Sequence, residues 1–138
     1  DNTVDLILVK ELIALTKPLT FTFHRAFDCV PNPIDALQQL IDLGADRILT
    51  SGQEASAEAG IDLLIQLKEQ ASHKIIMLPG SGITAENAKV FKNAGFQEIH
   101  TSASKIIKPN TLGKLDFENI IQTEADMIII KSILKAIK

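Results

Sequence analysis

The string TFTFHRAFD places three chemically active side chains close together in the sequence. His24 supplies an imidazole, Arg25 a guanidinium and Asp28 a carboxylate, a set that could bind a metal, hold an anion or move a proton. Strand alternation puts His24 on the face opposite Phe21 and Phe23, and so toward a cleft rather than toward covering helices. A hydrogen-bonded core histidine and an Arg25–Asp28 ion pair are the structural alternatives.

A glycine-rich turn, formed by Gly80, Ser81 and Gly82, ends a second apolar run. Glycines let the backbone approach a ligand, and amides that open a helix can bind phosphate or carboxylate. Thr101 and Ser102 follow the next run, and barrels often bind phosphate between the loops after their last two strands. These residues are therefore candidate ligand-binding groups, with a tight strand-to-helix turn as the structural alternative.

Glu98 and His100 share strand parity and could converge with His24. Two imidazoles and a carboxylate would suit either a metal ion or acid–base catalysis. We therefore take His24 and Glu98 as candidate catalytic groups, and His24 and His100 as candidate metal ligands. Thr50 and Ser51 end another apolar run and are candidate ligand-binding residues. A role of Ser51 as a nucleophile would also need an adjacent base.

Four short apolar or β-branched segments that end in glycine or small polar residues are predicted to be buried strands. They cover 20–28, 47–53, 74–82 and 98–104. Their starts lie 24 to 27 residues apart, close to the roughly 30 residues of one strand-helix-strand unit. The repeat predicts alternating strands and helices.

The intervening segments carry helix signals. Asn32 and Pro33 predict a start and Gly44 a stop for one helix, while Thr84 starts another that ends near Gly95. Apolar residues at helical spacing mark 55–71. The chain opens as a helix, Thr123 begins a capping box for a C-terminal helix over 123–138, and 105–119 is predicted to be a loop.

Alternating strands and helices of this length predict an α/β fold with a parallel sheet and right-handed crossovers. An open doubly wound sheet and a TIM-barrel type (β/α)8 fold both satisfy the pattern. A barrel needs roughly 200 residues or more. With 138 residues and four units, the chain is expected to be a single domain, 1–138, and if its parent fold is a barrel, half of that barrel is missing.

Composition narrows the functional classes. A net charge of -3 and an aromatic content of 4%, all of it Phe, do not favour binding to nucleic acid. The most apolar stretch is interrupted by Lys131 and Lys135, so no membrane-spanning helix or membrane partner is expected. The single cysteine, Cys29, suits a reducing compartment.

The strings FTFHRAFD, NPIDALQQLIDLGADRILTSGQ, IIMLPGSGI with Asn87, and EIHTSAS together resemble the CutC family of copper homeostasis proteins. The resemblance covers about residues 1–104 in order. It implies a cytoplasmic (β/α)8 barrel associated with copper tolerance or copper binding, of which this chain would carry strands five to eight. The family's polar barrel mouth corresponds to eight positions: His24, Arg25, Asp28, Thr50, Ser51, Gly80, Gly82 and His100.

The family's first-half features have no counterpart in this sequence, including the N-terminal cysteines usually discussed for copper. Two functions follow as hypotheses. The first is copper handling, with His24 and His100 as ligands. The second is an enzyme acting on a small anionic or phosphorylated metabolite. Because an incomplete barrel exposes strand edges and apolar surface, the chain is also expected to form a homo-oligomer or to aggregate.

Overall fold

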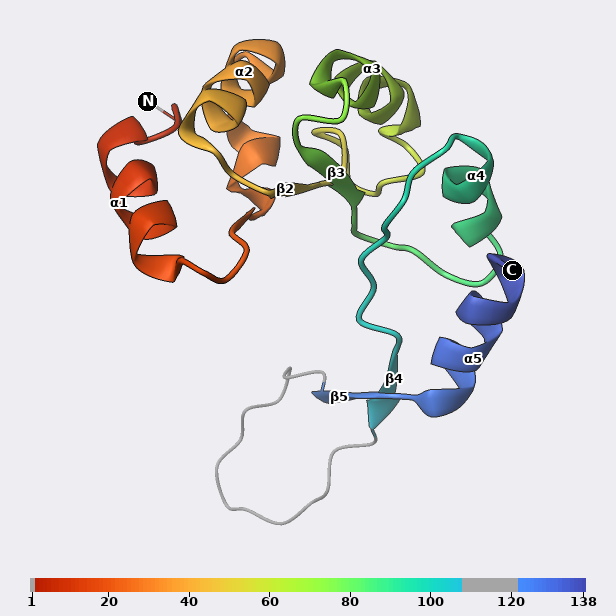
Figure 1. Cartoon of the computed structure of the whole chain (residues 1–138). Coiled ribbons are helices and arrows are strands. Elements are labelled where there is room, and N and C mark those ends of the chain that lie inside the picture. The colour runs from red at the N-terminus through yellow and green to blue at the C-terminus, as the bar shows by residue number, and fades with distance from the viewer. Residues whose placement is uncertain (1, 108–121) are drawn as a thin grey trace, which may run out of the picture.

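The computed structural model describes residues 2–107 and 122–138 (Figure 1). The elements in chain order are α1 (Leu6–Thr16), β1 (Thr22–Phe23), the 3-10 helix η1 (Arg25–Cys29), α2 (Pro33–Leu43), β2 (Arg47–Thr50), α3 (Ile61–Ala71), β3 (Ile76–Pro79), α4 (Ala88–Asn93), β4 (Ser104–Ile107), β5 (Gln122–Ala125) and α5 (Met127–Ala136). None of the helices in these ranges has the length and hydropathy needed to span a bilayer.

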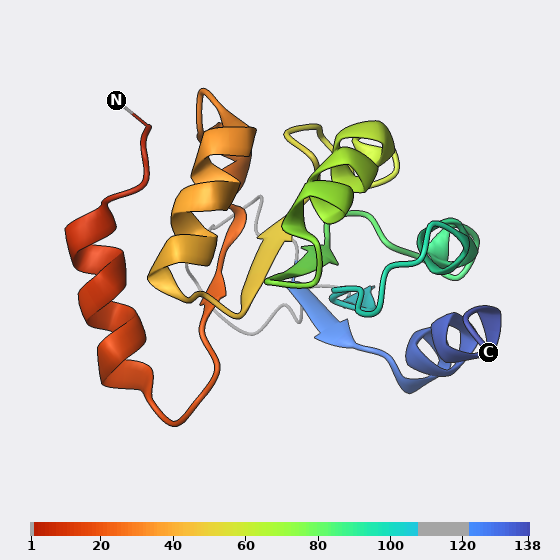
Figure 2. The same cartoon turned by 45° about the horizontal axis from the view of Figure 1, so that its top comes forward.

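The central sheet is parallel, with the order β1-β2-β3, which confirms the predicted α/β class. Thr22 pairs with Arg47, and Arg47 with Ile76. The segment predicted as a fourth strand, 98–104, contributes a single parallel bridge between His100 and Gly80. The helices follow one another in an arc along this sheet, as the two views show (Figures 1 and 2).

The strand predicted over 20–28 is wrong in its second half. Strand β1 ends at Phe23, and η1 begins at Arg25. His24 caps η1, because its Nδ1 accepts a hydrogen bond from the backbone N–H of Ala26 (3.1 Å). Local side-chain bonds of this kind compete with a strand ladder, and here they turn the chain at the end of the sheet.

The C-terminal region also differs from the prediction. Strands β4 and β5 pair antiparallel, so 105–107 are extended where the sequence predicted a loop, and 123–125 where it predicted a helix. Lys105 holds this pair to the start of α5 by ion pairs with Glu124 (3.3 Å) and Asp126 (3.0 Å). Asp126, rather than Thr123, is the N-cap of α5. The rest of the predicted loop lies outside the described residues.

Both predicted boundaries of α2 are confirmed, whereas the predicted starts of α3 and α4 shift. Asn32 caps α2 and Gly44 ends that helix at a φ of 80°, as predicted. Helix α3 starts at Ile61 rather than near residue 55, because 51–60 forms a turn-rich connection. Asn87, rather than Thr84, is the N-cap of α4.

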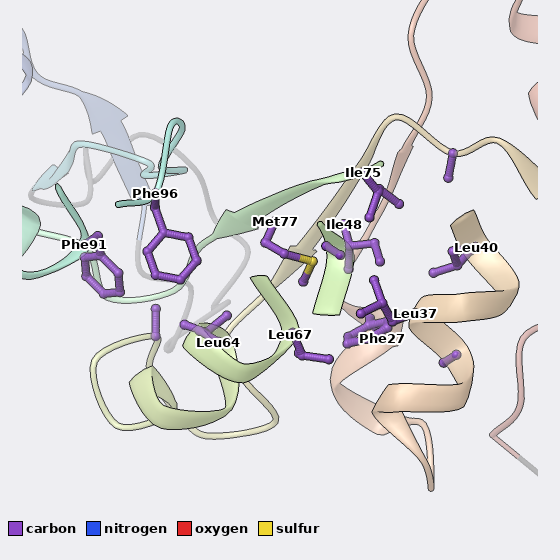
Figure 3. Packing of buried hydrophobic residues seen from close by; sticks show 14 of the residues in the cluster. Phe27, Leu37, Leu40, Ile48, Leu64, Leu67, Ile75, Met77, Phe91 and Phe96 are labelled. Carbon is purple, nitrogen blue, oxygen red and sulfur yellow. The ribbon is translucent and has the colours of Figure 1, made fainter. Parts of the chain in front are cut away.

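The core lies between the sheet and the helices (Figure 3). Ile48 of β2 and Met77 of β3 are neighbours in register and point toward the helices, where Leu37 and Leu64 are fully or almost fully buried. Phe27 of η1 is fully buried beside them. Burial of such side chains, each worth roughly 1.5–3 kcal/mol, fixes the helices on one face of the sheet and leaves the strand ends for the site.

Candidate functional site

A cavity of about 610 Å³ opens at the carboxyl end of the parallel sheet. Its wall is formed by the segments that follow β1, β3 and the His100 bridge, together with one face of α5. The polar residues that matter for its chemistry are Arg25, Ser81, His100, Thr101, Ser102 and Ser132. The carboxyl ends of parallel strands are where α/β folds build their ligand sites, because loops and helix starts meet there.

Asp28 lies beside this cavity and is the shared acceptor of several hydrogen bonds. Its carboxylate accepts hydrogen bonds from Thr50 Oγ1 (2.5 Å), the backbone N–H of Ser51 (3.0 Å) and Arg25 Nε (2.7 Å). Burial raises the pKa of this carboxyl, but the bonds from Thr50, Arg25, Ser51 and Gln53 outweigh burial and hold the pKa below its usual value. Asp28 therefore stays ionised and ties η1 to the end of β2.

Arg25 is positioned by this network. Its Nε contacts Asp28, and its Nη2 donates to Ser51 Oγ at 2.9 Å. Ser51 Oγ also lies 2.6 Å from the carbonyl oxygen of Glu54, to which it donates. Thr50 and Ser51 are fully buried. Ser51 holds Arg25 directly, and Thr50 holds it through Asp28. The residues predicted to bind a ligand that line the cavity are Arg25, Ser81, Gly82, Thr101 and Ser102.

Asn87 organises the glycine-rich turn and was not among the predicted site residues. Its Oδ1 accepts from the backbone N–H of Thr84 (2.9 Å), and its Nδ2 donates to the carbonyl oxygen of Gly82 (2.9 Å) and to Glu58 Oε2 (3.1 Å). The side chain is buried. The available signal was an Asn three residues after Thr84, a spacing that permits local capping bonds.

Two loops meet at the cavity as the sequence predicted. Thr101 Oγ1 donates to the carbonyl oxygen of Ile83 (3.0 Å), which joins the loop after His100 to the glycine-rich turn. Gly80 permits this approach, because a Cβ there would lie 3.3 Å from the Cβ of His100 and 2.5 Å from Leu49 Cδ1. Ser102 Oγ lies 3.0 Å from Ser104 Oγ.

The structure does not bring the predicted trio of His24, Glu98 and His100 together. Glu98 accepts two hydrogen bonds from Arg47, one from Nε (2.8 Å) and one from Nη2 (3.0 Å), and these bonds lower the pKa of its carboxyl. Arg47 begins β2, so Glu98 lies at the opposite end of the sheet from Asp28. Across residues 2–107 and 122–138, no three His, Cys, Asp or Glu side chains form a group able to hold a metal.

His24 and His100 differ in how readily each could bind a metal ion. The ring nitrogen Nδ1 of His24 accepts a hydrogen bond from the backbone N–H of Ala26, so the neutral ring carries its proton on Nε2. To bind a metal through Nε2, the ring would have to move this proton to Nδ1. Nδ1 could then no longer accept from Ala26, and the cap bond would break. His100 is exposed and lines the cavity. Imidazole nitrogen suits copper, and His100 is the better placed of the two to supply it.

Comparison with known proteins gives a consistent result. The model of the CutC family matches residues 1–105. A CutC family protein of Edwardsiella ictaluri is 50% identical over 112 residues, which cover 81% of this chain and 44% of that protein. One from Bacteroides fragilis is 48% identical over 106 residues, covering 76% and 42%. The chain thus spans less than half the length of these curated relatives.

A solved structure is also similar. It is the crystal structure of CutC from Streptococcus agalactiae, provisionally named a copper homeostasis protein. The TM-score is 0.66 with 31% sequence identity, and the match covers 72% of this chain and 50% of that one. Both sequence and fold therefore relate this chain to the same group of proteins.

Proposed function

This chain belongs to the CutC family, and on that premise we propose that it takes part in copper homeostasis in the cytoplasm. The observation that carries the proposal is the match to the family over residues 1–105, supported by the Streptococcus agalactiae relative. The single cysteine fits a reducing compartment. The comparisons favour this role over the second hypothesis, an enzyme acting on an anionic metabolite.

We further propose that the described βα units form part of a (β/α)8 barrel. The parallel order β1-β2-β3, with the helices outside and the Gly80–His100 bridge extending the sheet, supports this architecture. The chain covers less than half of the length of its relatives, and four of the eight βα units of a barrel would cover a similar share. Its cavity would then lie at the mouth of the barrel.

Copper is the proposed cargo, and His100 is its principal contact, with His24 second. The two residues come from strand ends that have β2 and β3 between them in the sheet. Neighbouring strands are about 4.8 Å apart, so the two imidazoles start roughly 14 Å from each other along the sheet. They are therefore best tested one at a time as well as together.

Removal of His100 is expected to weaken copper binding at least about tenfold, a loss typical of a perturbed metal site. Isothermal titration of Cu(I) and Cu(II) into the 138-residue chain would compare the wild type with His100→Ala, His24→Ala and the double variant. His24→Ala should have the smaller effect, because its ring already serves as the cap of η1.

The matched control is His73→Ala. His73 is exposed and precedes β3, so it lies at the other end of the sheet, and its removal should leave copper affinity unchanged. Equal affinity of wild type and double variant would overturn the ligand assignment.

Self-association is proposed from the apolar surface that the described structure leaves uncovered. On α1, Ile7 is 77% and Leu15 is 81% exposed, and on α5, Ile128 is 78% exposed. Exposed large apolar residues gathered on one helix, as on α1, mark an interaction surface or an aggregation site. A second copy of the chain is the proposed partner.

An Ile7→Gln, Leu15→Gln double variant should therefore shift the chain toward smaller species. Light scattering after size exclusion is expected to give at least a dimer for the wild type and a lower mean mass for the variant. Val9→Ala in the same helix, which trims a buried side chain, serves as the control for loss of stability. A monomeric wild type with a cooperative thermal transition would contradict the proposal.

A further inference from the structure

We propose that the cavity beside Arg25 is a binding site for a small phosphate monoester, whose phosphate is held by the guanidinium. This site would be additional to copper handling, and its ligand class follows from the donors, the charges and the size of the cavity.

Arg25 offers a preformed fork to the cavity. A guanidinium has five N–H donors, and the bonds to Asp28 and Ser51 use two of them, on the Nε and Nη2 edge. The other end, with Nη1 and the second hydrogen of Nη2, remains for two parallel bonds to an oxyanion. Because the side chain is already held on one edge, binding costs less conformational entropy than for a free arginine.

A hydroxyl donor also lines this cavity. Ser102 Oγ and Ser104 Oγ are 3.0 Å apart, and only one of them can donate in that contact. The other O–H is therefore available to a ligand oxygen. Thr101, by contrast, already donates to Ile83, so its role is to hold the two loops together.

The remaining lining residues set the charge and the size of the ligand. Glu86 also lines the cavity, and a hydrogen bond from Thr84 lowers the pKa of its carboxyl, which therefore stays negatively charged. Because Glu86 repels an anion, the phosphate of the ligand must lie on the Arg25 side. Leu49 and Ile129 form apolar wall. A volume of about 610 Å³ is far larger than a phosphate ion and suits a small organic molecule that carries one.

Binding to the 138-residue chain can be measured with phenyl phosphate as the probe, by calorimetry and by amide shifts in NMR spectra. Wild type is expected to bind with a Kd of roughly millimolar or below, and Arg25→Gln to weaken it roughly ten- to hundredfold. Benzoate and phenol, as carboxylate and neutral analogues, should bind more weakly. Inorganic phosphate should also bind more weakly, because it lacks the apolar part.

The matched control is Lys89→Gln, which removes one positive charge from an exposed position on α4 outside the cavity and should leave the Kd within about twofold. Arg25→Gln also removes a partner of Asp28, so circular dichroism must show that it folds. If it does not fold, variants of Ser132 test the proposal instead. Ser132 lines the cavity from α5, and its hydroxyl donates to Ile129 rather than to Asp28 or Ser51.

Ser132→Lys should tighten and Ser132→Glu weaken phenyl phosphate binding, each roughly two- to fivefold at low salt. Absence of binding by the wild type, equal binding by folded Arg25→Gln, or the same response of the two Ser132 variants would overturn the proposal. Copper titration is a separate measurement, so failure here leaves the copper assignment untouched.

Discussion

Replacement of Asp28 by alanine is expected to lower the free energy of unfolding by roughly 3–5 kcal/mol. The substitution removes the acceptor shared by Thr50, Ser51, Gln53 and Arg25. Thr50 and Ser51 are fully buried, so their donors would lose a partner where water does not reach. Urea unfolding followed by far-ultraviolet circular dichroism measures the loss.

Two variants serve as controls for Asp28→Ala. Asp28→Asn keeps the shape and one acceptor oxygen, and should lie between wild type and alanine. Asp42→Ala removes an exposed carboxylate that accepts only from Gln38 on the same helix, and should cost at most about 0.5 kcal/mol. Similar losses for Asp28→Ala and Asp42→Ala would show that the Asp28 network does not stabilise the fold.

The same carboxylate predicts a pH dependence. The pKa of Asp28 is lower in the folded chain than its ordinary value of 3.8, so the unfolded chain binds the proton more readily. Its stabilising contribution is complete above that ordinary value and is lost as the pH falls through the folded pKa. The stability difference between wild type and Asp28→Asn should therefore shrink between about pH 5 and pH 3.

The second large effect is expected for Gly52→Ala, with a loss of roughly 2–5 kcal/mol. Gly52 has a φ of 72°, and a Cβ at this position would overlap the backbone carbonyl oxygen of Gly60. That contact joins the segment after β2 to the start of α3, and Gly52 lies between Ser51 and Gln53, whose backbone N–H groups donate to Asp28, so a shift of Gly52 would disturb the Asp28 network. Thermal and urea unfolding report the loss.

Gly44→Ala separates the two causes. Gly44 has a φ of 80°, yet a Cβ there would meet no atom within 4 Å, so this variant carries the left-handed strain alone, about 1–2 kcal/mol. The excess loss in Gly52→Ala then measures the close approach to Gly60. Equal losses in the two variants would mean that the chain relaxes around the added methyl group.

Local patterns predicted much of the framework. Phe21 and Phe23 are partly buried against the core, while Thr22 and His24 are exposed, as the period of two requires. The cap at Asn32 and the stop at Gly44 are where their residue types placed them. Such features depend on neighbours within a few positions, which is why a single sequence is sufficient to predict them.

The candidate site was predicted less completely, because its contacts join distant residues. Glu98 has the strand parity of His100, but its hydrogen-bond partner is Arg47, 51 positions away. Parity predicts the face of the sheet on which a side chain lies, but not the end of the sheet. Asn87 shows the same limit, since its bond to Glu58 joins residues 29 positions apart.

The sequence by itself determined the α/β class, the placement of Gly80 directly after a strand, and the resemblance that assigned the family. Only the tertiary structure decided that Asp28 orients Arg25, that 104–107 pairs with 122–125, and that Glu98 lies away from the cavity beside Arg25. The physical reason is range: caps and alternation are local. Hydrogen-bond partners across a sheet depend instead on how the helices pack and which strand ends they bring together.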